Sequence, residues 1–153
     1  MTIVIADDHP FTLQGTQSFV ESYGYQVVAA CANGVSALNM IQLRQPDMAI
    51  LDINMPALDG LDVARKVQEL KLKTKIILLT MHNEMTVYNK SKEYGVYGYI
   101  LKEHAQVELK NCLVEVAKGN QYVSDSLMSD LVSVRETGTS ELDKLTFSER
   151  KII

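Results

Sequence analysis

Short apolar runs alternate with helical patterns over the first 120 residues, and this alternation limits the fold more than any other feature of the sequence. Each run is shorter than a typical helix and is followed by turn-forming residues, which is typical of a strand. The predicted strands cover residues 2–6, 25–31, 48–51, 75–79 and 96–101. The predicted helices cover residues 10–23, 84–94 and 105–118, with two more marked by apolar faces at 37–41 and 61–70.

Strands that alternate with helices form a parallel sheet with helices on both of its faces. The predicted strands at 2–6, 48–51 and 75–79 are nearly all apolar, as a sheet covered on both sides requires. Five such units fit the flavodoxin-like doubly wound α/β fold, with strand order 2-1-3-4-5 and five helices. The strand order comes from that fold, because the apolar pattern alone leaves the order of the strands open.

The character of the sequence changes after Gly119, so we expect one compact domain over residues 1–120. A linker follows over residues 121–144, with a helical pattern that Ser124 could cap. A new amphipathic pattern begins at residue 145 and stops at residue 153. We therefore expect residues 145–153 to be the start of a further domain that is truncated at this point.

The net charge of −4 is shared evenly, with −2 on residues 1–120 (13 acids, 11 bases) and −2 on residues 121–153 (6 acids, 4 bases). Neither part is basic, so we do not expect this stretch itself to bind DNA. Cys31 and Cys112 lack metal-ligand spacing and are expected to be buried thiols in a reducing compartment. With no signal peptide or membrane-spanning run in the sequence, we expect a cytoplasmic protein without a membrane partner.

Polar residues at the ends of the predicted strands are the best candidates for a functional site. In an open parallel sheet, ligands bind outside the carboxyl ends of the strands. Asp7 and Asp8 follow the first strand, Asp52 the third, Thr80 the fourth and Lys102 the fifth. We therefore expect these five side chains to meet at one edge of the sheet.

Three converging carboxylates repel one another unless protons or a cation neutralise them. Oxygen ligands of high negative charge favour a hard cation, and we expect Mg²⁺. A carboxylate can also act as a nucleophile and form an aspartyl phosphate. Asp52 is the best placed nucleophile, because it lies on a central strand between the acidic pair and the Thr80/Lys102 pair. Mg²⁺, the Lys102 ammonium and the Thr80 hydroxyl would then stabilise the phosphoryl oxygens.

Each candidate also has an ordinary structural explanation when it is taken alone. Asp7 and Asp8 fit a loop and a helix N-cap, Thr80 fits a strand-end hydroxyl, and Lys102 fits a solvated charge. The functional interpretation depends on their combination, because clustered titratable groups are typical of functional sites.

Three histidines, His9, His82 and His104, each follow a predicted strand end on the same rim. No pair of them has the helical or hairpin spacing of metal ligands. We interpret them as ordinary rim histidines and not as ligands of a transition metal.

Four strings in the sequence resemble the response-regulator receiver family, over about residues 1–120. They are IADDHP at 5–10, ILDINMP at 50–56, LTMH at 79–82 and GYILK at 98–102. The spacings are 44 residues from Asp8 to Asp52, 28 to Thr80 and 22 to Lys102. Each string alone is weak, but all four in this order indicate the family strongly.

The resemblance implies that Asp52 is the phospho-acceptor and that a sensor histidine kinase donates the phosphoryl group. It also implies that Asp8 binds Mg²⁺ directly, that Asp7 binds it through water, and that the backbone carbonyl of Asn54 is a further ligand. Turnover of an external substrate is not expected. A phosphohydrolase using Asp52 is disfavoured, because Asn54 stands where a second carboxylate would be needed.

The resemblance further implies that Thr80 and Tyr99 form a switch pair, in which Thr80 moves toward the phosphoryl group and Tyr99 rotates inward. Residues 145–153, and the receiver sequence itself, are similar to the LuxR/NarL-type regulators, whose helix-turn-helix would begin there. The whole protein would then homodimerise on activation and regulate transcription by binding DNA through the missing domain. Larger residues than usual between positions 92 and 97 leave an alternative open, a dimerisation or interaction module that works without phosphorylation.

Overall fold

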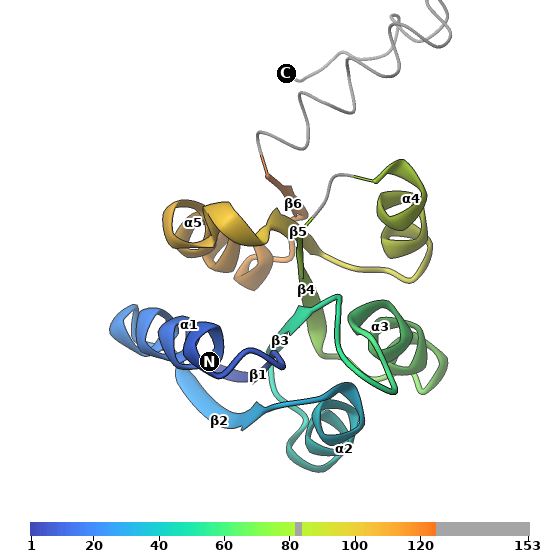
Figure 1. The fold of residues 1–153 in the computed structure, drawn as a ribbon, viewed down its shortest axis with the longest axis horizontal. Coiled ribbons are helices and arrows are strands. Elements are labelled where there is room, and N and C mark those ends of the chain that lie inside the picture. Colours follow the sequence, from blue (N-terminus) through green and yellow to red (C-terminus); the bar gives the residue numbers. More distant parts are fainter. Residues whose placement is uncertain (82–83, 125–153) are drawn as a thin grey trace, which may run out of the picture.

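The computed structural model describes residues 1–81 and 84–124, and its elements alternate as expected (Figure 1). The strands are β1 (Thr2–Ala6), β2 (Gln26–Cys31), β3 (Met48–Asp52), β4 (Lys75–Thr80), β5 (Gly98–Leu101) and β6 (Tyr122–Val123). The helices are α1 (Pro10–Ser22), α2 (Gly34–Arg44), α3 (Gly60–Glu69), α4 (Met85–Glu93) and α5 (Ala105–Ala117), with a 3-10 turn, η1, at Lys102–His104. The strand–helix series predicted from the apolar runs is confirmed.

The strands form one parallel sheet in the order β2-β1-β3-β4-β5-β6. The expected order 2-1-3-4-5 is confirmed, and the sheet has one strand more than the five expected. This sixth strand lies in the region expected to be a linker, and it pairs with β5. The Tyr122 N–H donates to the Tyr97 carbonyl over 2.8 Å, and the Ser124 N–H donates to the Tyr99 carbonyl over 2.9 Å. The sheet therefore extends past residue 120.

The helices cover both faces of the sheet, with α1 and α5 on one face and α2, α3 and α4 on the other (Figure 1). Successive residues of β1 point to opposite faces, as a strand requires. Ile3 and Ile5 belong to the core under α1 and α5, whereas Val4 and Ala6 belong to the core on the other face. Both cores are apolar, which explains why the central strands contain almost no polar residues before their ends.

The loop from β3 to α3 is held close against the end of the strand. A Cβ atom at Gly60 would lie 2.6 Å from the Asp52 carbonyl oxygen, so a larger residue does not fit there. The Gly60 N–H donates to the Ile53 carbonyl over 3.0 Å. Asp59 and Asp62 form a reciprocal capping box that begins α3. These contacts fix the backbone directly after Asp52.

Some expectations fall on residues that the structure does not describe. These are the helix expected after Ser124 within the linker, the domain start expected at 145–153, and the position of His82. Among the residues that are described, no helix has the length and apolar character needed to cross a membrane.

Candidate functional site

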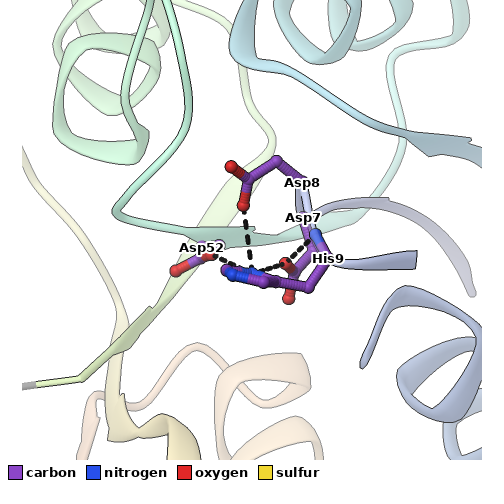
Figure 2. A group of neighbouring side chains, drawn as sticks. All are labelled: Asp7, Asp8, His9 and Asp52. Atoms are coloured by element: carbon purple, nitrogen blue, oxygen red, sulfur yellow. Dashed lines mark hydrogen bonds and ion pairs between the residues drawn. The ribbon is translucent and has the colours of Figure 1, made fainter. Parts of the chain in front are cut away.

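Three carboxylates gather at the carboxyl ends of β1 and β3 (Figure 2). Asp7 and Asp8 follow β1, and Asp52 is the last residue of β3. Asp7 is 2% exposed and Asp52 is 0% exposed, whereas Asp8 lies at the surface. Ligand-type atoms of these three residues and of His9 all lie within 4.8 Å of one another. The predicted meeting of the acidic residues is therefore present in the structure.

Lys102 completes the centre of the site from the end of β5. Its Nζ atom lies 3.0 Å from Asp52 Oδ2 and donates a hydrogen bond to it. The same atom donates to Asp7 Oδ1 over 3.2 Å. Nζ also lies 3.0 Å from Asp7 Oδ2, but without the alignment of a hydrogen bond. The Lys102 side chain is 10% exposed, so this pairing takes place largely out of water.

The surroundings shift the pKa values of the central pair. Burial raises the pKa of Asp52, and the charge of Asp7 raises it further, while the hydrogen bond and charge of Lys102 oppose the rise. Burial lowers the pKa of Lys102, but its hydrogen bonds to Asp52 and Asp7 outweigh this effect and raise it. A negative charge on Asp52 is therefore costly in this site, and a neighbouring cation favours it.

The donor atoms fit a hard divalent cation. Three carboxylates face one ammonium, so the site carries excess negative charge when the acids are ionised. Asp7 Oδ2 is buried and makes no hydrogen bond among the described residues, and the ammonium that lies 3.0 Å from it is shared with Asp52. Carboxylate oxygens are the ligands that Mg²⁺ prefers. The acidic cluster is therefore compatible with a metal site.

Thr80, at the end of β4, is buried beside this centre, and Thr80 and Leu101 are partners in the β4–β5 register. Tyr99, on β5, is 2% exposed and packs edge-on against Tyr88 of α4, with ring centroids 5.3 Å apart. Burial raises the pKa of Tyr99 to about 12, and the Thr80 hydroxyl opposes the rise. The Tyr99 ring thus already points into the core beneath α4.

Asn54 lies on the loop after β3 and is exposed. Its N–H donates to Asp52 Oδ1 over 3.3 Å, so the backbone at this position turns toward the nucleophile candidate. This contact holds one oxygen of the Asp52 carboxylate, while Lys102 holds the other.

His9 is the member of the cluster that the sequence interpretation missed. Its side chain is 61% exposed, as expected of a rim residue, but its Nδ1 atom lies 3.0 Å from Asp7 Oδ1 and 3.1 Å from Asp8 Oδ1. His104, by contrast, lies 4.0 Å from Glu108 on α5 and is not part of the cluster. The direct succession of Asp7, Asp8 and His9 at a strand end was the signal that could have indicated this.

Comparison with known proteins gives a consistent picture. The chain matches the family described as response regulator receiver domain over residues 3–114. It is 30% identical over 153 residues to the probable transcriptional regulatory protein NarL of Mycobacterium tuberculosis, covering 99% of this chain and 71% of that protein.

Solved structures agree with this match. A two-component response regulator of the LuxR family from Aurantimonas sp. has a TM-score of 0.82 and 26% identity, covering 88% of this chain and 96% of that one. The response regulator RcsB in a complex with DNA has a TM-score of 0.80 and 25% identity, covering 89% of this chain and 69% of that one. The chain therefore belongs to the response regulator receiver family, of the NarL/LuxR type that serves two-component signalling and transcription regulation.

Proposed function

We propose that this receiver accepts a phosphoryl group on Asp52 in a Mg²⁺-dependent reaction. The observation that carries the proposal is the position of the Asp52 carboxylate, 3.0 Å from the Lys102 ammonium and within the cluster formed by Asp7 and Asp8. A phosphohistidine of a sensor histidine kinase would be the donor. A bond forms between an Asp52 carboxylate oxygen and phosphorus, the phosphorus–nitrogen bond of the donor breaks, and the leaving imidazole takes up a proton.

The chain's own residues would supply most of the catalysis by position and charge. Lys102 would move from its contact with Asp52 to pair with a phosphoryl oxygen, and the Thr80 hydroxyl would donate to another. Asp8 would hold the metal directly, Asp7 would hold it through water, and the Asn54 carbonyl would be a further ligand. When bound, Mg²⁺ would neutralise negative charge on the transferring group.

The covalent phosphoryl group would act as a switch. Attraction of the Thr80 hydroxyl toward the phosphoryl oxygens would change the space beside Tyr99, whose buried ring contacts Tyr88 of α4. A small change at the site would thereby shift the population of two arrangements of α4 and β5. In the NarL/LuxR type, we expect this shift to favour a homodimer and DNA binding by a further domain, in the cytoplasm, without turnover of an external substrate.

A small phosphodonor tests the phosphorylation directly. The protein is incubated with acetyl phosphate and Mg²⁺, and the intact mass is measured. The wild type gains the mass of one phosphoryl group, and Asp52→Asn gains none. Asp47→Asn, at the opposite end of the same strand, is the matched control and is labelled like the wild type. Equal labelling of wild type and Asp52→Asn would overturn the proposal.

A second candidate is an interaction module that works without phosphorylation. The feature that favours it is the group of large side chains between positions 92 and 97, where Lys92 is exposed and lies 5.6 Å from the Tyr88 ring centroid. The oligomeric state is measured by light scattering with and without beryllofluoride, a phosphoryl mimic. A mass that rises with beryllofluoride supports the phosphorylation switch, and an unchanged mass supports the second candidate.

A further inference from the structure

The imidazole of His9 lies within the acidic cluster in a position that the proposed magnesium chemistry does not use. We propose that His9 is a nitrogen ligand of the metal site, so that the site binds Mn²⁺ and Co²⁺ more tightly, relative to Mg²⁺, than an all-oxygen site would. This inference rests on the metal site of the proposed function and adds a ligand and a cation preference to it.

The distances around His9 Nδ1 fit a shared metal ion. Nδ1 lies 3.0 Å from Asp7 Oδ1, 3.1 Å from Asp8 Oδ1 and 3.8 Å from Asp52 Oδ2. Neighbouring ligands of an octahedral ion, each about 2.1 Å from the metal, are about 3.0 Å apart. The distance to Asp8 matches this edge length, so His9 and Asp8 can be neighbouring direct ligands of one ion without a large rearrangement of the side chains, while Asp7 binds the ion through water.

The charge balance around the ring also favours a further cation. Asp7 is buried, and the Lys102 ammonium that lies 3.0 Å from its Oδ2 atom is shared with Asp52, which is also buried. Buried carboxylates that share one ammonium carry excess negative charge, and a coordinated cation is one way to offset that cost. Because the Asp7 carboxylate also accepts a hydrogen bond from the His9 backbone N–H, over 2.8 Å, this carboxylate and the imidazole are kept together.

The contacts of the His9 Nδ1 atom conflict with one another when no metal ion is bound. Nδ1 faces two carboxylate oxygens, which need a donor, and it also lies 3.2 Å from the Lys102 ammonium, which needs an acceptor. One ring nitrogen cannot both carry and lack a proton. A neutral imidazole bound to a metal satisfies the carboxylates through the metal, and Lys102 then keeps its bonds to Asp52 and Asp7.

Ligand chemistry predicts the cation preference. Mg²⁺ favours oxygen ligands and keeps several waters, so an imidazole adds little to its affinity. Imidazole nitrogen suits later divalent ions of the first transition row, whose affinities rise in the order Mn²⁺, Fe²⁺, Co²⁺ and Ni²⁺. The effect of His9 should therefore be small for Mg²⁺, larger for Mn²⁺ and larger again for Co²⁺.

The test uses the three cations as probes on wild type, His9→Ala and His104→Ala, by calorimetric titration at about pH 8, where an ordinary imidazole is neutral. His104→Ala is the matched control, because His104 lies on the same rim outside the cluster. We expect His9→Ala to weaken Co²⁺ binding about tenfold or more, as loss of even an outer-sphere partner can. Mg²⁺ binding should change less than about twofold, and His104→Ala should match the wild type.

A measurement on the wild type keeps the test independent of how the variant folds. Nitrogen-15 spectra of the histidine rings are recorded as Co²⁺ is added, and the His9 ring signals should show large paramagnetic shifts that differ from those of His104. Unshifted His9 signals, together with equal Co²⁺ affinities of wild type and His9→Ala, would overturn the inference that His9 is a ligand. If Mg²⁺ still binds the wild type, that result leaves the proposed function intact. Failure of all three cations to bind the wild type would overturn the metal site itself.

Discussion

The two ends of strand β3 each carry an aspartate, and the two residues lie in opposite surroundings. Asp47, before the strand, is exposed, and its Oδ2 accepts hydrogen bonds from the Thr2 N–H over 2.8 Å and the Thr2 hydroxyl over 3.3 Å. Asp52, at the other end, is fully buried beside Asp7, and its nearest cation is Lys102. At the amino end of the sheet, the aspartate accepts hydrogen bonds from neutral donors. At the carboxyl end, several charged groups are buried together.

This difference indicates what each end contributes. At the amino end, the polar groups join neighbouring segments, as in the bond from the Thr74 hydroxyl to the Pro46 carbonyl over 2.7 Å. Such bonds contribute modestly to stability. At the carboxyl end, buried charges cost stability, and such clusters of buried charge are typical of functional sites. Variants at the two ends should therefore change stability in different ways.

Removing the Lys102 ammonium, which pairs with Asp52 and Asp7, should lower the free energy of unfolding more than any other change considered. Lys102→Ala leaves both acids buried without their cation, and breaking a buried ion pair costs about 3 kcal/mol or more of unfolding free energy. Urea unfolding at neutral pH measures this loss. Lys118→Ala is the control, because Lys118 is exposed and lies 3.8 Å from Glu115, and it should change stability by less than about 0.5 kcal/mol. Similar losses in both variants would contradict the contrast between the ends.

Binding of Mg²⁺ at the carboxyl end of the sheet should raise the free energy of unfolding. At about ten times its dissociation constant, one ion that binds only the folded state adds about 1.4 kcal/mol of stability. Thermal unfolding with increasing Mg²⁺ should show this rise for the wild type and not for Asp8→Ala, which lacks the proposed direct ligand. The same rise in both proteins would place the ion somewhere else.

At the amino end, Asp47→Ala should lower the unfolding free energy by about 1 kcal/mol, because two hydrogen bonds to Thr2 are lost. Mg²⁺ should stabilise this variant as much as the wild type, since Asp47 lies at the far end of the strand. Urea unfolding with and without Mg²⁺ measures both quantities. A variant that is more stable than the wild type would contradict the structural role of Asp47.

Tyr99→Phe should have the smallest effect on the free energy of unfolding at neutral pH. Its buried hydroxyl makes no hydrogen bond of good geometry among the described residues, so Tyr99→Phe should change stability by less than about 1 kcal/mol. The pKa of Tyr99 is raised from 10.0 to about 12, so the folded state holds the phenol proton more tightly. That stabilisation is present below pH 10 and is lost as the pH rises through about 12. The wild type should therefore lose stability relative to Tyr99→Phe over this range, and parallel pH profiles would contradict the burial.

The contrast also explains what could be predicted from the sequence. The apolar runs of β1, β3 and β4 are covered on both faces, so their composition indicated them within one residue of the observed bounds. Asp8, Asp52 and Lys102 could be brought together because the carboxyl ends of parallel strands share one edge. These inferences need only the backbone pattern.

Features that depend on local side-chain geometry were not predictable in this way. Strand β6 has only Tyr122 and Val123, too few residues for an alternating pattern, and it forms because the edge of β5 offers backbone partners. The His9 ring lies against Asp7 and Asp8, and that position depends on the side-chain torsions, which the sequence does not indicate. The extra strand and the extra cluster member were therefore both missed.

The most direct test of the central claim measures the unfolding free energies of wild type, Asp52→Asn and Asp47→Asn at pH 7, with and without Mg²⁺. Burial raises the pKa of Asp52, so the folded state favours the protonated carboxyl over the charged one. The free energy of unfolding should therefore fall as the pH rises through the folded pKa of this group. Without Mg²⁺, Asp52→Asn should therefore be more stable than the wild type, while Asp47→Asn should be no more stable than the wild type. Mg²⁺ should narrow the gap by stabilising the wild type more than Asp52→Asn. An Asp52→Asn variant that is less stable than the wild type without Mg²⁺, or an equal response of both to the ion, would contradict the account.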